Sequence, residues 1–167
     1  MKHFPLIAAL ALMPALAGCG LHPLYSGGGS GTVATALTRV EVGAIEGKAG
    51  WLMTNALNDR FHASGTPLYR LEIKLDDQII GLGVRRDDSV SRERRTLRAR
   101  YQLVDLSKVT VLLDATAGSD AGLDVVNSEY ATIAAENTAL ERLTEIVADQ
   151  IVSRVALYAQ RTAEPAK

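Results

Sequence analysis

Alternation of apolar and polar side chains dominates the middle of the chain. From Tyr69 to Leu75 the odd positions are apolar and the even positions are charged, which is the period of a strand with one buried face. A second stretch repeats the pattern, with Leu97, Ala99, Tyr101 and Leu103 on one side. A third runs from Val109 toward Val126 after a turn at residues 105–108. Three strands joined by short turns predict an antiparallel meander.

One irregularity interrupts the first of these strands. Its apolar positions change from odd to even across residues 76–78, before the glycine-containing run of residues 79–84. An extra residue in one strand produces such a change of face. We therefore expect a β-bulge at residues 76–78, with the strand continuing beyond it.

Helical periodicity flanks the meander. Apolar residues recur at helical spacing in residues 49–61, and again over a longer stretch at residues 131–160. Residues 38–45 alternate and predict one further strand before the first helix. The expected fold is α+β, with a four-stranded, largely antiparallel sheet and two helices packed on one face. The other face of the sheet is then left polar.

The N-terminus has the layout of a secretory signal peptide, with Lys2 before an apolar run and small residues at its end. Leu16-Ala17-Gly18-Cys19 resembles a bacterial lipobox, in which the cysteine is lipidated and becomes the first mature residue. Cys19 is the single cysteine of the chain. We expect a signal peptide at residues 1–18, the lipidated cysteine and a Gly/Ser-rich tether at 19–31, the α+β domain at 32–162, and a disordered tail at 163–167. Gly20 follows the cysteine, which favours the outer membrane.

Composition argues against several classes of function. Without residues 1–18 the chain has 17 basic and 19 acidic residues, a net charge of −2, so no global positive field favours nucleic acid. One cysteine excludes a disulfide framework within the chain and a cysteine-rich zinc site. His62 lies near a helix end, away from any Ser/Asp or metal-ligand pattern. Gly43 to Ala49 departs from a phosphate loop in glycine spacing and lacks its Ser/Thr. We expect no catalytic residues, metal or cofactor beyond the lipid on Cys19.

A local positive charge stands out against this background. The strand before Leu103 carries four arginines on its outward face, which we call the arginine ladder: Arg92, Arg94, Arg98 and Arg100. Residues 85–100 contain seven arginines and three acidic residues, so the segment is predicted to form a positive patch. Guanidinium groups bind phosphates or carboxylates through paired hydrogen bonds. The alternative is a solvated strand face whose charges prevent aggregation.

Trp51 is the only tryptophan of the chain. At 100° per residue it lies nearly opposite the apolar stripe of the first helix, so an exposed position is predicted. An exposed tryptophan is typical of a contact with a partner protein. The alternative is that the indole folds over the edge of the core.

The order of these features resembles the lipopolysaccharide-assembly outer-membrane lipoprotein family LptE (RlpB) in its alphaproteobacterial form. Two segments carry the resemblance most specifically, the start Cys19-Gly20-Leu21-His22-Pro23-Leu24-Tyr25 and the stretch from Asn127 to Asn137. The resemblance implies a lipid-anchored, non-enzymatic protein of the outer membrane that plugs the β-barrel LptD, helps that barrel assemble and assists lipopolysaccharide delivery to the outer leaflet. The arginine ladder would then meet either lipopolysaccharide or the barrel wall. The alternative is a periplasm-facing lipoprotein that binds a small amphiphile or acts as an assembly factor without a barrel partner.

Overall fold

One four-stranded sheet forms the centre of the molecule. The computed structural model describes residues 31–84, 90–126 and 128–163. The strands are β1 (Val40–Val42), β2 (Tyr69–Val84), β3 (Val90–Asp105) and β4 (Thr110–Asp124), and they lie side by side in sequence order. β1 is parallel to β2, whereas β2, β3 and β4 are antiparallel. The predicted α+β class and the largely antiparallel sheet are confirmed.

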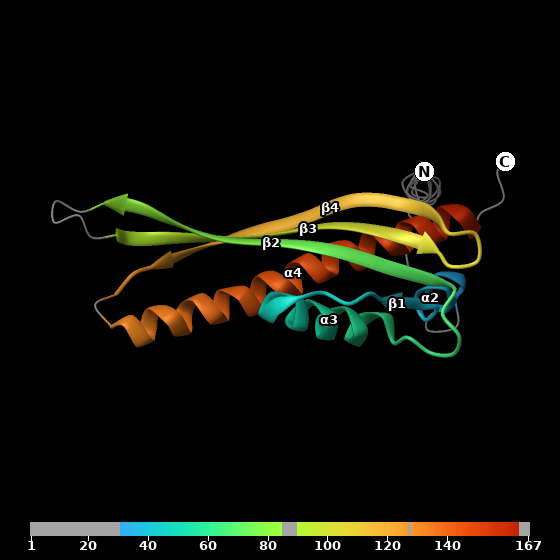
Figure 1. Cartoon of the computed structure of the whole chain (residues 1–167), viewed down its shortest axis with the longest axis horizontal. Coiled ribbons are helices and arrows are strands. Elements are labelled where there is room, and N and C mark those ends of the chain that lie inside the picture. The colour runs from blue at the N-terminus through green and yellow to red at the C-terminus, as the bar shows by residue number, and fades with distance from the viewer. Residues whose placement is uncertain (1–30, 85–89, 127, 164–167) are drawn as a thin grey trace, which may run out of the picture.

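Helices α3 (Gly47–Phe61) and α4 (Glu129–Ala163) both cover one face of this sheet (Figure 1). We call the uncovered side the open face. The 35 residues of α4 and the 16-residue strands β2 and β3 each extend about 50 Å. The domain is therefore long, with one helix following the sheet from end to end. None of the described helices has the length and apolarity that crossing a membrane requires.

The first strand is shorter than residues 38–45, which the alternation predicted. An additional short helix, α2 (Thr32–Leu37), precedes it, with Thr38 as its C-cap. After Val42 the chain bonds to β2 only through the Gly43 amide, which donates to the Leu71 carbonyl at 2.9 Å. The chain then turns into α3, where a Cβ on Gly50 would lie 2.5 Å from the Ile45 carbonyl oxygen. This glycine therefore allows the loop and the helix to approach each other closely.

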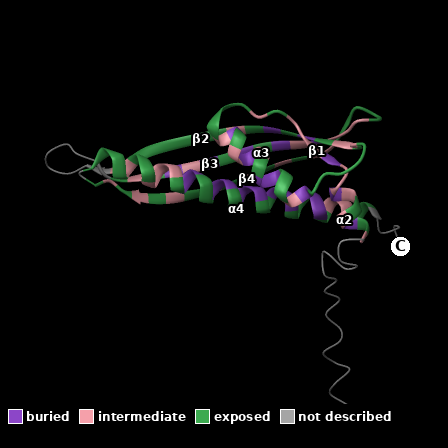
Figure 2. Ribbon diagram, turned by 90° about the horizontal axis from the view of Figure 1, so that it is seen from below, coloured by how far each residue is buried: buried purple, intermediate pink, exposed green. Residues whose placement is uncertain are grey.

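The core lies between the sheet and the two long helices. Its largest fully buried side chains come from α3, from β1, β2 and β3, and from one stripe of α4: Val40, Met53, Leu57, Phe61, Leu71, Leu97, Tyr101, Leu140, Leu143, Val147, Ile151 and Val155. Burial decreases toward the end of the sheet that α3 does not reach (Figure 2). There Ile79 is 41% exposed and Ile133, on the same stripe of α4, is 48% exposed.

The predicted bulge in β2 is wrong. The pairing of β2 with β3 runs without interruption from Tyr69↔Asp105 to Leu82↔Arg92, so residues 76–78 pair in regular register. Asp77 keeps the parity of the core residues and points to the helix side, because the buried Arg95 neutralises it. Ile80 consequently lies on the open face, 51% exposed. A shift of register does occur in the pairing of β3 with β4, between Leu103 and Val104.

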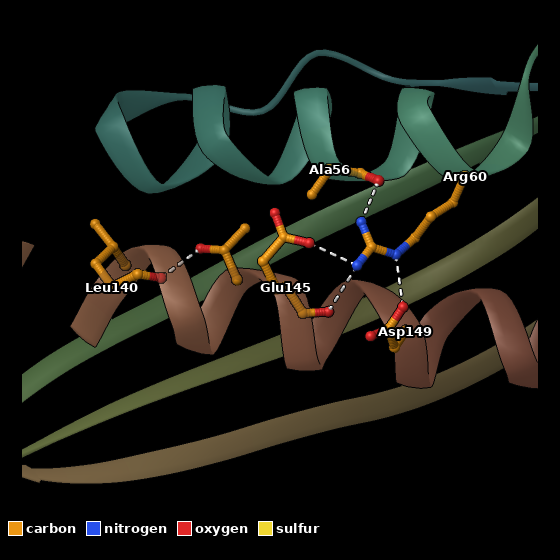
Figure 3. Close-up of polar contacts among 6 residues, drawn as sticks. Ala56, Arg60, Leu140, Glu145 and Asp149 are labelled. Atoms are coloured by element: carbon orange, nitrogen blue, oxygen red, sulfur yellow. Dashed lines mark hydrogen bonds and ion pairs between the residues drawn. The ribbon is translucent and has the colours of Figure 1, made fainter. Parts of the chain in front are cut away.

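Arg60 of α3 joins the two long helices (Figure 3). Its Nε donates to Asp149 Oδ1 and its Nη2 to Glu145 Oε2, both at 2.6 Å, and its Nη1 donates to the Ala56 carbonyl at 2.8 Å. The hydrogen bond to Asp149, with that to Glu145, raises the pKa of the guanidinium above its ordinary value. One side chain of α3 therefore holds the two carboxylates of α4 in place.

Candidate functional site

The structure places the arginine ladder on the open face of the sheet. Even-numbered residues of β3 point away from α3 and α4, whereas Leu97, Ala99, Tyr101 and Leu103 are buried beneath the helices. The side chains of Arg92 and Arg100 are 71% and 68% exposed. The alternation in the sequence therefore assigned both faces of β3 correctly.

Residues 85–89 of the predicted positive patch lie outside the described residues. The described part of the patch does not stand alone, because carboxylates of β4 lie beside the ladder. Arg92 pairs with Asp124 at 3.1 Å, Arg94 with Asp120 at 3.9 Å, and Arg100 with Asp114 at 3.1 Å. By register, the described open face holds six cations and six carboxylates: Arg70, Lys74, Arg92, Arg94, Arg98 and Arg100 against Glu41, Glu72, Asp76, Asp114, Asp120 and Asp124. The expectation of an unopposed positive strand is corrected to a face of balanced charge.

Asp114 shows this pairing most clearly. Arg100 and Gln102 both donate to its carboxylate, the amide at 2.8 Å. The hydrogen bond from Arg100, followed by that from Gln102, lowers the pKa of Asp114 below its ordinary value. The carboxylate is therefore held in its charged form, and it occupies hydrogen-bond donors that Arg100 would otherwise offer to a ligand.

Two cations of the open face differ from the others. Among the described residues, no carboxylate oxygen lies within 4.0 Å of Lys74 or Arg98. Lys74 pairs in register with Arg100, and Arg98 lies two residues further along the same face. A hollow of about 830 Å³ reaches Lys74 and Arg100 from the side of β1, and a second, of about 540 Å³, is lined by Lys74, Arg98 and Arg100. Lys74 and Arg98, with Arg100 beside them, form the candidate anion-binding site.

Gly118 of β4 makes room for one of them. It lies directly opposite Arg98, and a Cβ there would be 3.3 Å from the Cγ of Arg98 and 3.2 Å from the Leu97 carbonyl oxygen. A larger residue would press on the arginine stem from the side of the second hollow. The glycine thus leaves the Arg98 side chain free to extend over the open face.

Arg95 is a buried, structural arginine of the same strand that the sequence pattern did not reveal. It belongs to β3 but points to the helix side, where it is 8% exposed. Its Nε donates to Asp77 Oδ1 at 2.8 Å and its Nη1 to the Glu136 carbonyl at 2.8 Å. The hydrogen bond to Asp77 is the main cause of a raised pKa of Arg95, and burial opposes it. Arg95 therefore ties β2, β3 and α4 together and does not belong to the ladder.

The remaining predicted site residues do not join the ladder. Trp51 is 65% exposed on α3, as its helical angle predicted, and α3 lies on the face opposite the arginines. Cys19 and the signal peptide lie outside the described residues. Within the described part of the chain, no group of three or more His, Cys, Asp or Glu side chains could hold a metal ion.

The comparison with known protein families shows which family the chain belongs to. The model of the lipopolysaccharide-assembly family LptE matches residues 37–155. The chain belongs to the LptE family. The resemblance inferred from the sequence is thereby confirmed, and the match includes all four strands, the arginine ladder and Trp51. Cys19 precedes the matched residues.

Solved structures show the same fold. A candidate lipoprotein of Caulobacter crescentus CB15 has a TM-score of 0.66 at 23% identity, covering 77% of this chain and 96% of its own. The rare lipoprotein B of Shewanella oneidensis has a TM-score of 0.60 at 8% identity, covering 75% and 98%. A minor lipoprotein of Acinetobacter baumannii has a TM-score of 0.54 at 12% identity, covering 72% and 94%. No curated protein sequence matches the chain.

Proposed function

We propose that this LptE-family chain is an outer-membrane lipoprotein that plugs and helps assemble an LptD-type β-barrel and assists lipopolysaccharide insertion into the outer leaflet. The observation that carries the proposal is the family match over residues 37–155. Cys19 would bear the lipid and hold the domain at the periplasmic side of the membrane. Two or three acyl chains bind a bilayer stably, whereas a single chain does not. The role requires no catalytic residue and no cofactor besides this lipid.

The shape and charge of the domain support a position inside a barrel. Its length of about 50 Å exceeds the hydrocarbon thickness of a bilayer, about 30 Å, so it can follow a lumen through the membrane. Barrel interiors are polar. An open face with six cations and six carboxylates offers hydrogen-bond donors and acceptors to such a wall without a strong field of either sign. Exposed Trp51, on the opposite side, would contact the barrel through an apolar anchor.

The cations without a carboxylate partner support contact with lipopolysaccharide. Lys74 and Arg98 line the second hollow together with Arg100, and phosphate groups are the ligands that such a cluster favours. Within the ladder, Arg98 is therefore proposed to bind phosphate, with Arg100 beside it. Arg92 and Arg94, paired with Asp124 and Asp120, are proposed to face the barrel.

The binding part of the proposal can be tested with charge reversals. We expect the double variant Lys74→Glu/Arg98→Glu to fold normally, because both side chains project from the open face. It should bind lipopolysaccharide at least several-fold more weakly, and raising the salt concentration should reduce the difference. The matched control is Arg142→Glu/Arg161→Glu, which reverses two exposed arginines of α4 and should bind as the wild type does.

Two outcomes would contradict this assignment. Unchanged lipopolysaccharide binding by Lys74→Glu/Arg98→Glu would show that these cations do not contact the glycolipid; if barrel association were lost at the same time, they would belong to the barrel interface. Equal weakening by Arg142→Glu/Arg161→Glu would show that only the total charge of the domain matters.

A further inference from the structure

The outer edge of the sheet is unusually open to another strand. β4 has 15 residues and is the last strand of the sheet, so its second edge has no strand partner among the described residues. Proteins protect such edges with charged side chains, above all lysine, with proline, with bulges or with inward-pointing charges. Between Thr110 and Asp124 the sequence contains no lysine and no proline. Its three charged residues, Asp114, Asp120 and Asp124, are paired with arginines of β3. The other side of the sheet differs, since β2 carries Lys74 and the inward-pointing Asp77.

A single side chain of α4 occupies the middle of this edge. Gln150 Oε1 accepts a hydrogen bond from the Gly118 amide at 3.1 Å, and its Nε2 donates to the Gly118 carbonyl at 3.4 Å. One amide side chain thus satisfies both backbone groups of a strand residue, as a residue of a neighbouring antiparallel strand would. Gln150 therefore stands where the next strand of the sheet would lie.

The position of this contact divides the edge. Backbone groups of alternate residues point to the same side of a strand, so the outward-pointing groups of β4 are those with the parity of Gly118. They belong to residues 114 and 116 on one side of the glycine and to residues 120, 122 and 124 on the other. While Gln150 is in place, an added strand can pair with only two or three of them in succession.

Apolar side chains of α4 continue this edge as a surface. At 100° per residue, Ile146, Ser153 and Leu157 lie within about 60° of Gln150 on the helix. Ile146 is 45% exposed and Leu157 is 39% exposed. A strand edge and a helix flank with two exposed apolar side chains therefore lie next to each other. Arg154, about 40° from Gln150, and Asp149, one turn before Ser153, border this flank.

We infer that the β4 edge with this flank of α4 is a self-association surface for a second copy of the chain, and that Gln150 keeps it closed. An antiparallel pairing centred on Gly118 of both copies is self-complementary, as a two-fold interface requires. It sets Asp114 opposite Gly122 and Thr116 opposite Asp120, so no two carboxylates face each other. The same two-fold axis brings the flanks with Ile146 and Leu157 of the two copies together.

The control of self-association by Gln150 goes beyond the role proposed above, and its test does not depend on that role. If the domain does plug a barrel, a single copy is required, and the closed edge would keep the chain monomeric until it reaches its partner. The side chain of Gln150 is exposed, so its removal does not endanger the core.

The test compares the full-length lipidated protein and its variants in detergent by sedimentation velocity. We expect the wild type to be monomeric and Gln150→Ala to dimerise with a dissociation constant at least about tenfold lower, because the two hydrogen bonds between Gln150 and Gly118 in each copy no longer have to be broken. Ser153→Ala, on the same flank but without a bond to β4, should remain monomeric. Adding Ile146→Lys and Leu157→Lys to Gln150→Ala should restore the monomer.

Hydrogen exchange supplies the second measurement. In the Gln150→Ala dimer, the amides of residues 114, 116, 120 and 122 should become protected, while those that bond β3 should not change. The inference is overturned if Gln150→Ala stays monomeric at concentrations up to tenfold above those at which the wild type is measured. It is also overturned if the wild type dimerises as strongly as Gln150→Ala. A dimer that survives the two lysines, or that leaves β4 unprotected, would also overturn it.

Discussion

Arg95 and Asp77 form an ion pair on the helix side of the sheet, with the arginine Nε 2.8 Å from the carboxylate Oδ1. The side chains are only 10% and 24% exposed. The same guanidinium also donates to the carbonyl of Glu136 in α4. The pair thus replaces apolar packing near the N-terminal end of α3. Beyond this point, only α4 covers the sheet. It explains why an aspartate is tolerated on the helix-facing side of β2.

This pair should be costly to break on one side only. Arg95→Leu leaves Asp77 half-buried without its partner, and we expect the free energy of unfolding to fall by about 2 kcal/mol. The double variant Arg95→Leu/Asp77→Leu should regain most of that loss, since no unpaired charge remains. Urea denaturation of the four proteins in this cycle measures both effects. Additive losses in the double variant would show that the two side chains do not interact.

The ion pairs of Arg60 with Glu145 and Asp149, which join α3 to α4, should contribute less to stability than the pair of Arg95 with Asp77, and their contribution should fall with salt. Glu145 and Asp149 are 59% and 67% exposed, so solvent screens their attraction to Arg60. We expect Arg60→Ala to lower the free energy of unfolding by about 1 kcal/mol. Arg60→Lys keeps the charge but cannot reach both carboxylates and the Ala56 carbonyl, so it should lie in between. Thermal unfolding at low and high salt tests this, and a salt-independent loss would assign the effect to packing of the arginine stem.

Tyr101 should make the domain sensitive to alkaline pH. Burial raises the pKa of its hydroxyl group, and Arg154 opposes this shift. Because the folded state favours the protonated phenol, its contribution to stability is complete below the pKa of the unfolded chain, about 10, and is lost as the pH rises above it. We expect Tyr101→Phe to flatten the fall in unfolding free energy above pH 10. Tyr130→Phe, at an 85% exposed position, is the control and should follow the wild type.

Trp51 should matter for association and not for folding. Its side chain is 65% exposed, so Trp51→Ala should change the unfolding free energy by less than about 0.5 kcal/mol. If the indole anchors the domain to a barrel, the same variant should reduce recovery of that partner severalfold. Asn58→Ala, two turns along the same exposed side of α3, is the matched control. A photoreactive residue at position 51 that forms no crosslink to a protein of barrel size in intact membranes would contradict the role.

Local periodicity was sufficient to predict most of the elements and their faces. The alternation in residues 69–75 and 97–103 assigned the buried side of β2 and β3, and the helical spacing of residues 131–160 predicted α4 to within three residues at each end. The exposure of Trp51 followed from its angle alone. These features depend on neighbours within one element, and sequence spacing records them directly.

Features that depend on contacts between distant residues were missed. The bulge was predicted because the apolar positions change from odd to even across residues 76–78. The structure keeps the register because Asp77 is paired on the helix side with Arg95, which lies 18 residues away. The neutral open face depends on the register of β3 with β4, which brings Asp114, Asp120 and Asp124 beside the ladder. Helix α2 has six residues and no side-chain cap, so it depends on packing against α4.

The most direct test of the account is the recovery of this chain from detergent-solubilised outer membranes. Full-length protein carrying a C-terminal affinity tag is purified under mild conditions, and the same preparation of Cys19→Ser, which cannot be lipidated, is the control for anchoring. The account predicts that the lipidated chain is recovered with one protein of β-barrel size in equal amount, and that lipopolysaccharide accompanies the pair. Recovery of the lipidated chain without any stoichiometric partner of that size would contradict it.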